Sequence, residues 1–181
     1  MSMREFIQDI GRKQIEARTK ENDEYHLANF KKYVCFVLNE REYGVDIEFV
    51  QEIVEIGYIR KIIYTPSFLL GVINLRGSII AVIDLKQLFH LGSTDLKSPT
   101  ARLIISKFEG KGIAFVVDGI KKIREIAHTE VQQAPQTFNE IPTNFIVGMY
   151  KAPENNLLVL LNFSEVMATN EIKQLAGDNV E

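Results

Sequence analysis

The side chains of this 181-residue chain that are capable of chemistry are few and lie far apart in the sequence. His26, His90 and His128 fall in three different predicted elements, and no metal-ligand spacing links them. The lone cysteine, Cys35, lies in a run of strand-forming residues, where it suits a small core side chain. A single cysteine also excludes an internal disulfide framework. Neither a metal site nor a cysteine nucleophile is predicted.

The carboxylates at the ends of predicted strands are better explained by structure than by catalysis. Asp46, Asp84 and Asp118 each follow β-branched residues, at places where a carboxylate caps a helix or supports a turn. General acid or base catalysis needs groups that converge, and the sequence indicates no convergence. The glycine pair of residues 110–112 lacks the spacing and the Ser or Thr of a phosphate loop, so we predict a hairpin turn there. The sequence therefore predicts a protein that is not an enzyme and holds no cofactor and no metal.

Arg76 is harder to explain as an ordinary solvent-exposed charge. Arg76 stands in the segment G-V-I-N-L-R-G-S-I-I-A-V-I-D-L, which runs from Gly71 to Leu85. Val, Ile and Leu on both sides favour half-buried strands, and Asn74 with the Arg76-Gly77 pair marks a turn between them. A charge is thus fixed beside a core. It is either a structural clamp or the centre of a binding surface.

The elements around Arg76 form a pattern that occurs twice. A predicted hairpin over residues 33–47 has a counterpart over residues 102–117, and both are followed by similar apolar spacing. The matched segments are residues 50–56 with 120–126, 68–71 with 145–148, and 79–85 with 157–163. Asp84 with Gln87 and Asn162 with Glu165 resemble capping boxes, which predicts a capped helical turn at the end of each half. We predict an internal repeat.

Two units of about five short strands, each too small to bury much surface alone, must pack against one another. The sequence therefore predicts an all-β fold of two five-stranded barrel subdomains side by side with a shared apolar seam. We assign the first barrel to about 33–90 and the second to about 101–168. Residues 1–32 are interpreted as an extension that is helical or partly disordered, on the helical spacing of Met3, Phe6, Ile7 and Ile10. Residues 169–181 are predicted to be a helix end, capped near Gly177, and a polar tail.

Composition limits the partners. With 21 Lys and Arg against 24 Asp and Glu, the net charge is -3, which disfavours binding to nucleic acid or anionic lipid. The sequence shows neither a secretory apolar region nor an apolar run long enough to cross a membrane. We therefore expect a cytoplasmic protein without direct membrane insertion.

Five ordered pieces of the sequence resemble the CheW family of bacterial chemotaxis coupling proteins. They are residues 43–47, 50–53, 65–66, the Arg76 segment and residues 116–120, and the similarity covers about 33–168. The resemblance implies two five-stranded Src-homology-like barrels, with helical N- and C-terminal segments, and no catalysis. It implies an adaptor that couples the cytoplasmic tip of chemoreceptors to the regulatory domain of the histidine kinase CheA. The free protein is expected to be a monomer, recruited to membrane-associated receptor arrays.

The candidate partner-binding positions are Val50, Glu52, Gly71, Asn74, Arg76, Gly77, Ile120 and Ile123. The resemblance implies Glu52 and Arg76, and it places Val50, Ile120 and Ile123 in segments that the family uses for contact. Gly71 and Gly77 are included because a partner's backbone could approach them closely. Arg76 and Glu52 carry opposite charges beside apolar neighbours, so we expect their side chains to approach each other. For the two glycines a turn or bulge is the plainer explanation, and for Asn74 a bond to its own turn is favoured over a partner. Ile120 and Ile123 cannot both face outward on a regular strand, so core packing is favoured for Ile123 unless a bulge at Asp118-Gly119 shifts the register.

Two questions stay open at the level of sequence. In the second half, Lys151-Ala152-Pro153 replaces the turn that holds Arg76, and this asymmetry favours a partner anchor over a general folding role. The alternatives to a coupling protein are a related regulatory module and a small ligand-binding barrel. The latter lacks convergent reactive residues.

Overall fold

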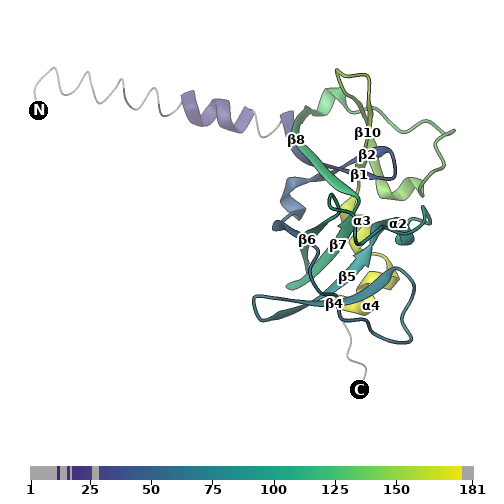
Figure 1. Cartoon of the computed structure of the whole chain (residues 1–181). Coiled ribbons are helices and arrows are strands. Elements are labelled where there is room, and N and C mark those ends of the chain that lie inside the picture. Colours follow the sequence, from purple (N-terminus) through teal and green to yellow (C-terminus); the bar gives the residue numbers. More distant parts are fainter. Residues whose placement is uncertain (1–11, 13–15, 17, 26–28, 177–181) are drawn as a thin grey trace, which may run out of the picture.

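The computed structural model describes residues 12, 16, 18–25 and 29–176, and within them ten strands form two five-stranded sheets (Figure 1). The strands are β1 (Phe30–Leu38), β2 (Arg41–Asp46), β3 (Glu52–Glu55), β4 (Leu69–Leu75), β5 (Ser78–Asp84), β6 (Arg102–Phe108), β7 (Lys111–Val117), β8 (Gly119–Ala127), β9 (Ile146–Lys151) and β10 (Leu157–Leu161). Short 3-10 helices lie between strands, at η1 (Ile47–Phe49), η2 (His128–Glu130) and η3 (Thr143–Phe145). The prediction of a mostly β fold with two five-stranded units is confirmed.

The two halves of the sequence are interlocked. The order in one sheet, here sheet A, is β8-β1-β2-β10-β9, and the order in the other, sheet B, is β3-β6-β7-β5-β4. Adding or subtracting five converts one order into the other, which supports the internal repeat. Each sheet thus joins the first hairpin of one half to the last three strands of the other half. The prediction that residues 33–90 build one barrel and 101–168 the other is wrong.

The segment in which the chain passes from sheet A to sheet B explains why the assignment of the barrels was wrong. After β2 the chain makes the single turn of η1, and the backbone N-H of Gln51 then donates to the carbonyl of Ile105 in β6, at 2.8 Å. The chain has therefore changed sheets within five residues of Asp46. Hydrophobic alternation specifies that a strand has a buried face, but not which neighbour it pairs with. Parallel pairs, β2 with β10 and β5 with β7, complete each sheet across the halves.

The two sheets share one core, as predicted. Its cluster of buried residues takes Phe36 and Val159 from sheet A, Ile104 and Phe115 from sheet B, and Phe163 from the helix that follows β10. The rings of Phe115 and Phe163 lie 5.0 Å apart between centroids, a distance typical of favourable aromatic packing. Each sheet buries its other face in a smaller cluster of its own. The apolar seam therefore holds together segments from both halves of the chain.

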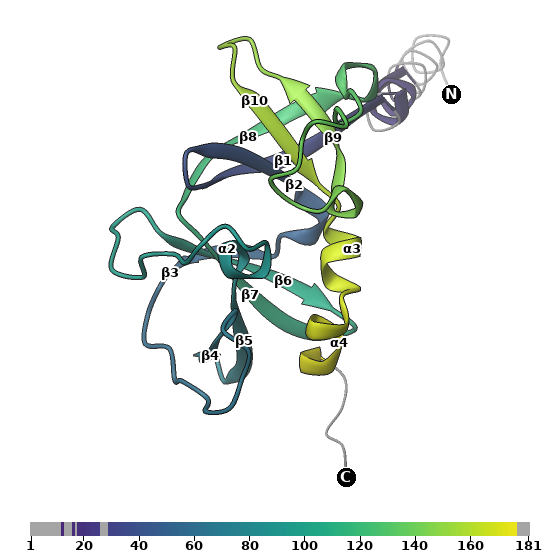
Figure 2. The same ribbon diagram turned by 90° about the vertical axis from the view of Figure 1, so that its right-hand side faces the viewer.

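Short capped helices close each half. Asp84 accepts from the backbone N-H of Lys86 at 3.0 Å and caps α2 (Leu85–Leu88), while Asn162 accepts from Glu165 N-H at 3.3 Å and caps α3 (Phe163–Met167). Capping at both sites is confirmed. Figure 2 shows α3 and α4 (Asn170–Ala176) running along one side of both sheets.

At the N-terminus, residues 18–25 are helical, but the apolar positions that predicted the extension lie outside the described residues, as does the predicted Gly177 cap. Among the described helices, none is long and apolar enough to span a bilayer.

Candidate functional site

Arg76 lies at the tip of the β4–β5 hairpin in a left-handed backbone conformation. Its φ is 50° and that of Gly77 is 88°, which is the geometry of a two-residue hairpin turn with both central residues at positive φ. Glycine, asparagine or aspartate normally occupies the first of these places, because a longer side chain is strained there. Asn74 supports the turn, since its Oδ1 accepts from Gly77 N-H at 2.8 Å. The predicted local bond of Asn74 is thus confirmed.

The guanidinium of Arg76 is held by Glu52 through two parallel bonds. Nη1 and Nη2 donate to the two carboxylate oxygens at 2.7 and 2.8 Å. The expectation that these side chains approach each other is confirmed. The Arg76 side chain nevertheless stays 75% exposed, against 27% for Glu52. The hydrogen bonds from Arg76 to Glu52 raise the pKa of Arg76 above its ordinary value, so it remains a cation. An anion on a partner could therefore still contact the free edge of this cation.

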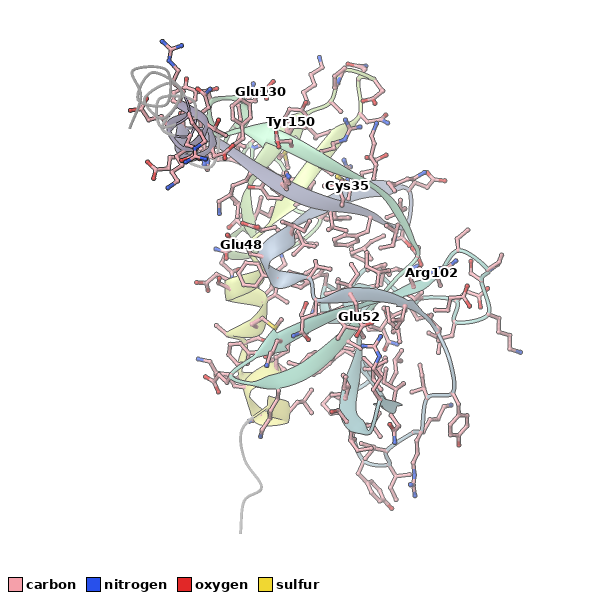
Figure 3. The ribbon with its side chains drawn as sticks, turned by 90° about the vertical axis from the view of Figure 1, so that its left-hand side faces the viewer. Cys35, Glu48, Glu52, Arg102, Glu130 and Tyr150 are labelled. Carbon is pink, nitrogen blue, oxygen red and sulfur yellow. The ribbon has the colours of Figure 1, made fainter. Side chains whose placement is uncertain are left out.

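This ion pair joins opposite edges of sheet B. Glu52 is on β3, the strand at one edge, and Arg76 is on the hairpin that ends with β4, the strand at the other edge. The sheet must curl for these residues to meet, so the pair closes the sheet upon itself. Figure 3 shows Glu52 on β3 in the lower sheet and Cys35 on β1 in the upper one. We call the Arg76–Glu52 pair the first clamp.

An exposed isoleucine lies beside the first clamp. Ile79 on β5 is 68% exposed and lines the same surface hollow as Arg76. Ile53 on β3 is 38% exposed, on the strand face opposite to Glu52. Ile79 was not predicted as a site residue, although the sequence held a signal: it lies one residue past Ser78, on the face opposite to the buried Ile80. A fixed charge beside an exposed apolar side chain is a composition that suits a protein interface.

Gly71 and Gly77 serve different purposes. At Gly71, φ is +142° and a Cβ would collide with the backbone carbonyl of Arg60, which forms a bridge to Val72. The backbone that approaches this glycine is therefore the protein's own. Around Gly77 a Cβ would meet nothing within 4 Å, so only its positive φ demands glycine. Gly148, the counterpart of Gly71, is likewise covered by the backbone of Gln132.

We expect Gly71→Ala to destabilise the fold much more than Gly77→Ala. The first adds a clash with backbone to an unfavourable φ, at a cost of about 3 kcal/mol, and the second costs about 1 kcal/mol from backbone strain alone. Urea unfolding followed by circular dichroism measures both. Equal losses for the two variants would contradict the close approach of Arg60.

The remaining site residues lie at the seam and on sheet A. Val50 and Ile120 are partly buried and pack against the shared core. Ile123 is 58% exposed, so the preference for core packing was wrong for this residue. Ile123 lies on β8, a strand at the edge of sheet A, where fewer neighbours cover a side chain. This strand does contain a bulge: Val34 pairs with Ile123 and Phe36 with Ile120, which leaves one extra residue in β8. The predicted condition, a shift of register in this strand, is met, although between Ile120 and Ile123 and not at residues 118–119.

Reactive groups do not converge in the described part of the chain. No group of three His, Cys, Asp or Glu residues there could hold a metal ion. Asp84 accepts from Thr94 and Lys86, and Asp118 pairs with the largely buried ammonium of Lys86 at 3.1 Å. Burial raises the pKa of the Cys35 thiol to about 11, so it is not a thiolate at neutral pH. These groups hold the fold together.

The CheW-like domain family model matches residues 32–171, which is most of the chain. The chain belongs to the CheW family. It is 32% identical over 147 residues to the chemotaxis protein CheW of Treponema pallidum, covering 80% of this chain and 86% of that protein. The corresponding protein of Klebsiella aerogenes is 29% identical over 150 residues, covering 83% and 88%.

A solved CheW structure has the same fold. The scaffolding protein TtCheW of Thermoanaerobacter tengcongensis superposes with a TM-score of 0.69 at 35% identity, covering 78% of this chain and 90% of that one. The sequence resemblance is confirmed, and with it the function class. This CheW-family chain is a chemotaxis coupling adaptor, a scaffold without catalytic activity.

Proposed function

We propose that this protein couples the cytoplasmic tip of chemoreceptors to the histidine kinase CheA, with the first clamp at the centre of a partner-binding surface. The observation that carries the proposal is the exposed, doubly bonded guanidinium of Arg76 beside the exposed Ile79. Glu52 fixes the direction of the cation before a partner arrives, which lowers the ordering cost of binding. The protein acts in the cytoplasm, at arrays of membrane-associated receptors.

The strained turn supports this role. An arginine at positive φ is less favourable than glycine or asparagine, and its exposed ion pair returns little stability, since surface pairs contribute little. Stability alone is therefore a weak reason for arginine at this position. Anchors of protein interfaces are often arginines, because a desolvated guanidinium loses several bonds when it is truncated.

The other predicted positions surround the first clamp or the seam. Asn74 and Gly77 shape the turn, and Gly71 lets the residue 60 segment cover β4. Val50 and Ile120 lie at the margin of the core that joins the sheets. Ile123 offers an apolar contact on sheet A. We propose that both sheets take part in partner contact, because a coupling protein must hold two partners together.

Reconstitution tests this function. The chain is mixed with a receptor fragment and CheA, complexes are sedimented, and kinase autophosphorylation is followed with and without the chain. We expect co-sedimentation of all three proteins and a kinase rate that depends on the receptor only when the chain is present. An unchanged rate together with no co-sedimentation would refute the proposal.

A further inference from the structure

Sheet A has an ion-pair cluster that the sequence did not reveal. Glu154, in the turn between β9 and β10, accepts from Lys122 Nζ at 2.7 Å and from Arg124 Nη2 at 3.0 Å. Lys122 and Arg124 lie on β8, the strand at one edge of this sheet, while β9 is the strand at the other edge. The cluster therefore joins the two edges of sheet A, as Arg76 and Glu52 join those of sheet B.

The correspondence extends to single positions. The repeat aligns residue 50 with 120, so Lys122 occupies the place of Glu52, and the β9–β10 turn that carries Glu154 matches the β4–β5 turn that carries Arg76. The sign of each charge is reversed: the turn is basic in one sheet and acidic in the other. An exposed isoleucine follows each clamped strand residue, Ile53 in β3 and Ile123 in β8.

The side chains of Glu154, Lys122 and Arg124 are held in place by their hydrogen bonds and, for Arg124, by burial. The Arg124 side chain is only 12% exposed, although Lys122 and Glu154 are about half exposed. Hydrogen bonds from Lys122, from its own backbone N-H and from Arg124 lower the pKa of Glu154 to about 2. The carboxylate therefore keeps its charge and both partners at any pH near neutrality.

We infer that Glu154, with Lys122 and Arg124, is a second clamp of reversed polarity that closes sheet A and positions β8, so that Ile123 is presented to a partner. The position of β8 needs such support because its hydrogen bonds to β1 are interrupted by the bulge between Ile120 and Ile123. In this view Glu154 is a positioning residue that need not touch the partner. The inference rests on the proposed coupling function only in its last part, the presentation of Ile123.

Hydrogen exchange in the free full-length protein tests the clamp itself. We expect Glu154→Gln and Lys122→Gln to raise the exchange rate of the β8 amides several-fold and to leave β3 unchanged, since β3 is held by the first clamp. The matched control is Lys121→Gln, which removes an equal charge from the adjacent exposed position on the same strand. Unchanged β8 exchange in Glu154→Gln, or equal increases in the Lys121→Gln control, would overturn the second clamp.

Affinity tests the positioning role. We expect Glu154→Gln to weaken binding to the reconstituted receptor–CheA mixture by about threefold to tenfold, as Ile123→Ala does, and the double variant to be little worse than either single one. Faster β8 exchange with wild-type affinity would overturn positioning. If the wild-type chain fails to bind either partner, the proposed function fails, whereas the exchange experiment still decides whether the clamp exists.

Discussion

Cutting the chain between Lys97 and Ser98 should leave two fragments that do not fold separately. The first fragment keeps the β1–β2 and β4–β5 hairpins, and β3 loses its partner β6, so no sheet of more than two strands remains. The second fragment keeps β6–β7 and β9–β10, while β8 loses β1. Isolated two-stranded hairpins are at best marginally stable in water. We expect the two fragments to have no cooperative thermal transition alone and to regain one when mixed in equal amounts.

Circular dichroism melting of fragments 1–97 and 98–181 measures this effect. The uncut full-length chain is the reference, and each fragment is melted at the concentration used for the mixture. A cooperative transition in fragment 1–97 alone would show that one half builds a barrel by itself. That result would contradict the interlocked topology.

Arg76→Ala should weaken partner binding by about tenfold or more while leaving the far-UV circular dichroism spectrum unchanged. The loss arises because the partner groups that faced the guanidinium stay unpaired. Arg76→Lys should retain part of the affinity, since an ammonium keeps the charge but loses the planar double contact. Binding to the receptor fragment and to CheA is measured separately, by sedimentation or calorimetry.

The control is Lys97→Ala, an exposed cation in the loop between α2 and β6. It should leave both affinities at the wild-type value. A similar loss in Lys97→Ala would indicate a general effect of net charge, and unchanged affinity in Arg76→Ala would remove Arg76 from the interface.

The strands, the turns and the internal repeat could be predicted from the sequence, because these features depend on local patterns. Strand alternation, the Asn74 and Gly77 turn and the Asp84 and Asn162 caps are all properties of a few neighbouring residues. The approach of Glu52 to Arg76 was also predicted, although 24 residues separate them. That prediction was based on the opposite charges of the two residues and on the apolar residues next to each of them.

The exchange of strands between halves was not predictable in this way. Both barrels offer equivalent edges to the hairpin β1–β2, and only the short η1 connection decides which one it joins. The exposure of Ile123 was missed for a related reason. The hydrophobic pattern does not show that β8 lies at the edge of its sheet, where a side chain can stay uncovered.

The second clamp bears on the role of Arg76. The sequence suggested that only one half carries such a residue, and this favoured a partner anchor over a folding role. Glu154 shows that the second half has a counterpart, with the charges exchanged. Both ion pairs thus join the two edges of a sheet, and partner contact by Arg76 must be tested apart from this role.

A charge-swapped pair separates the two roles of Arg76 most directly. The single variants Arg76→Glu and Glu52→Arg place like charges together, and the double variant restores an ion pair of opposite polarity at the same two positions. Thermal stability and affinity for the receptor fragment and CheA are measured for all four proteins. We predict that the double variant recovers the stability lost by the single variants, while its affinity stays at least tenfold below the wild-type value. Full recovery of affinity in the double variant would show that Arg76 only closes the sheet, and would contradict the account.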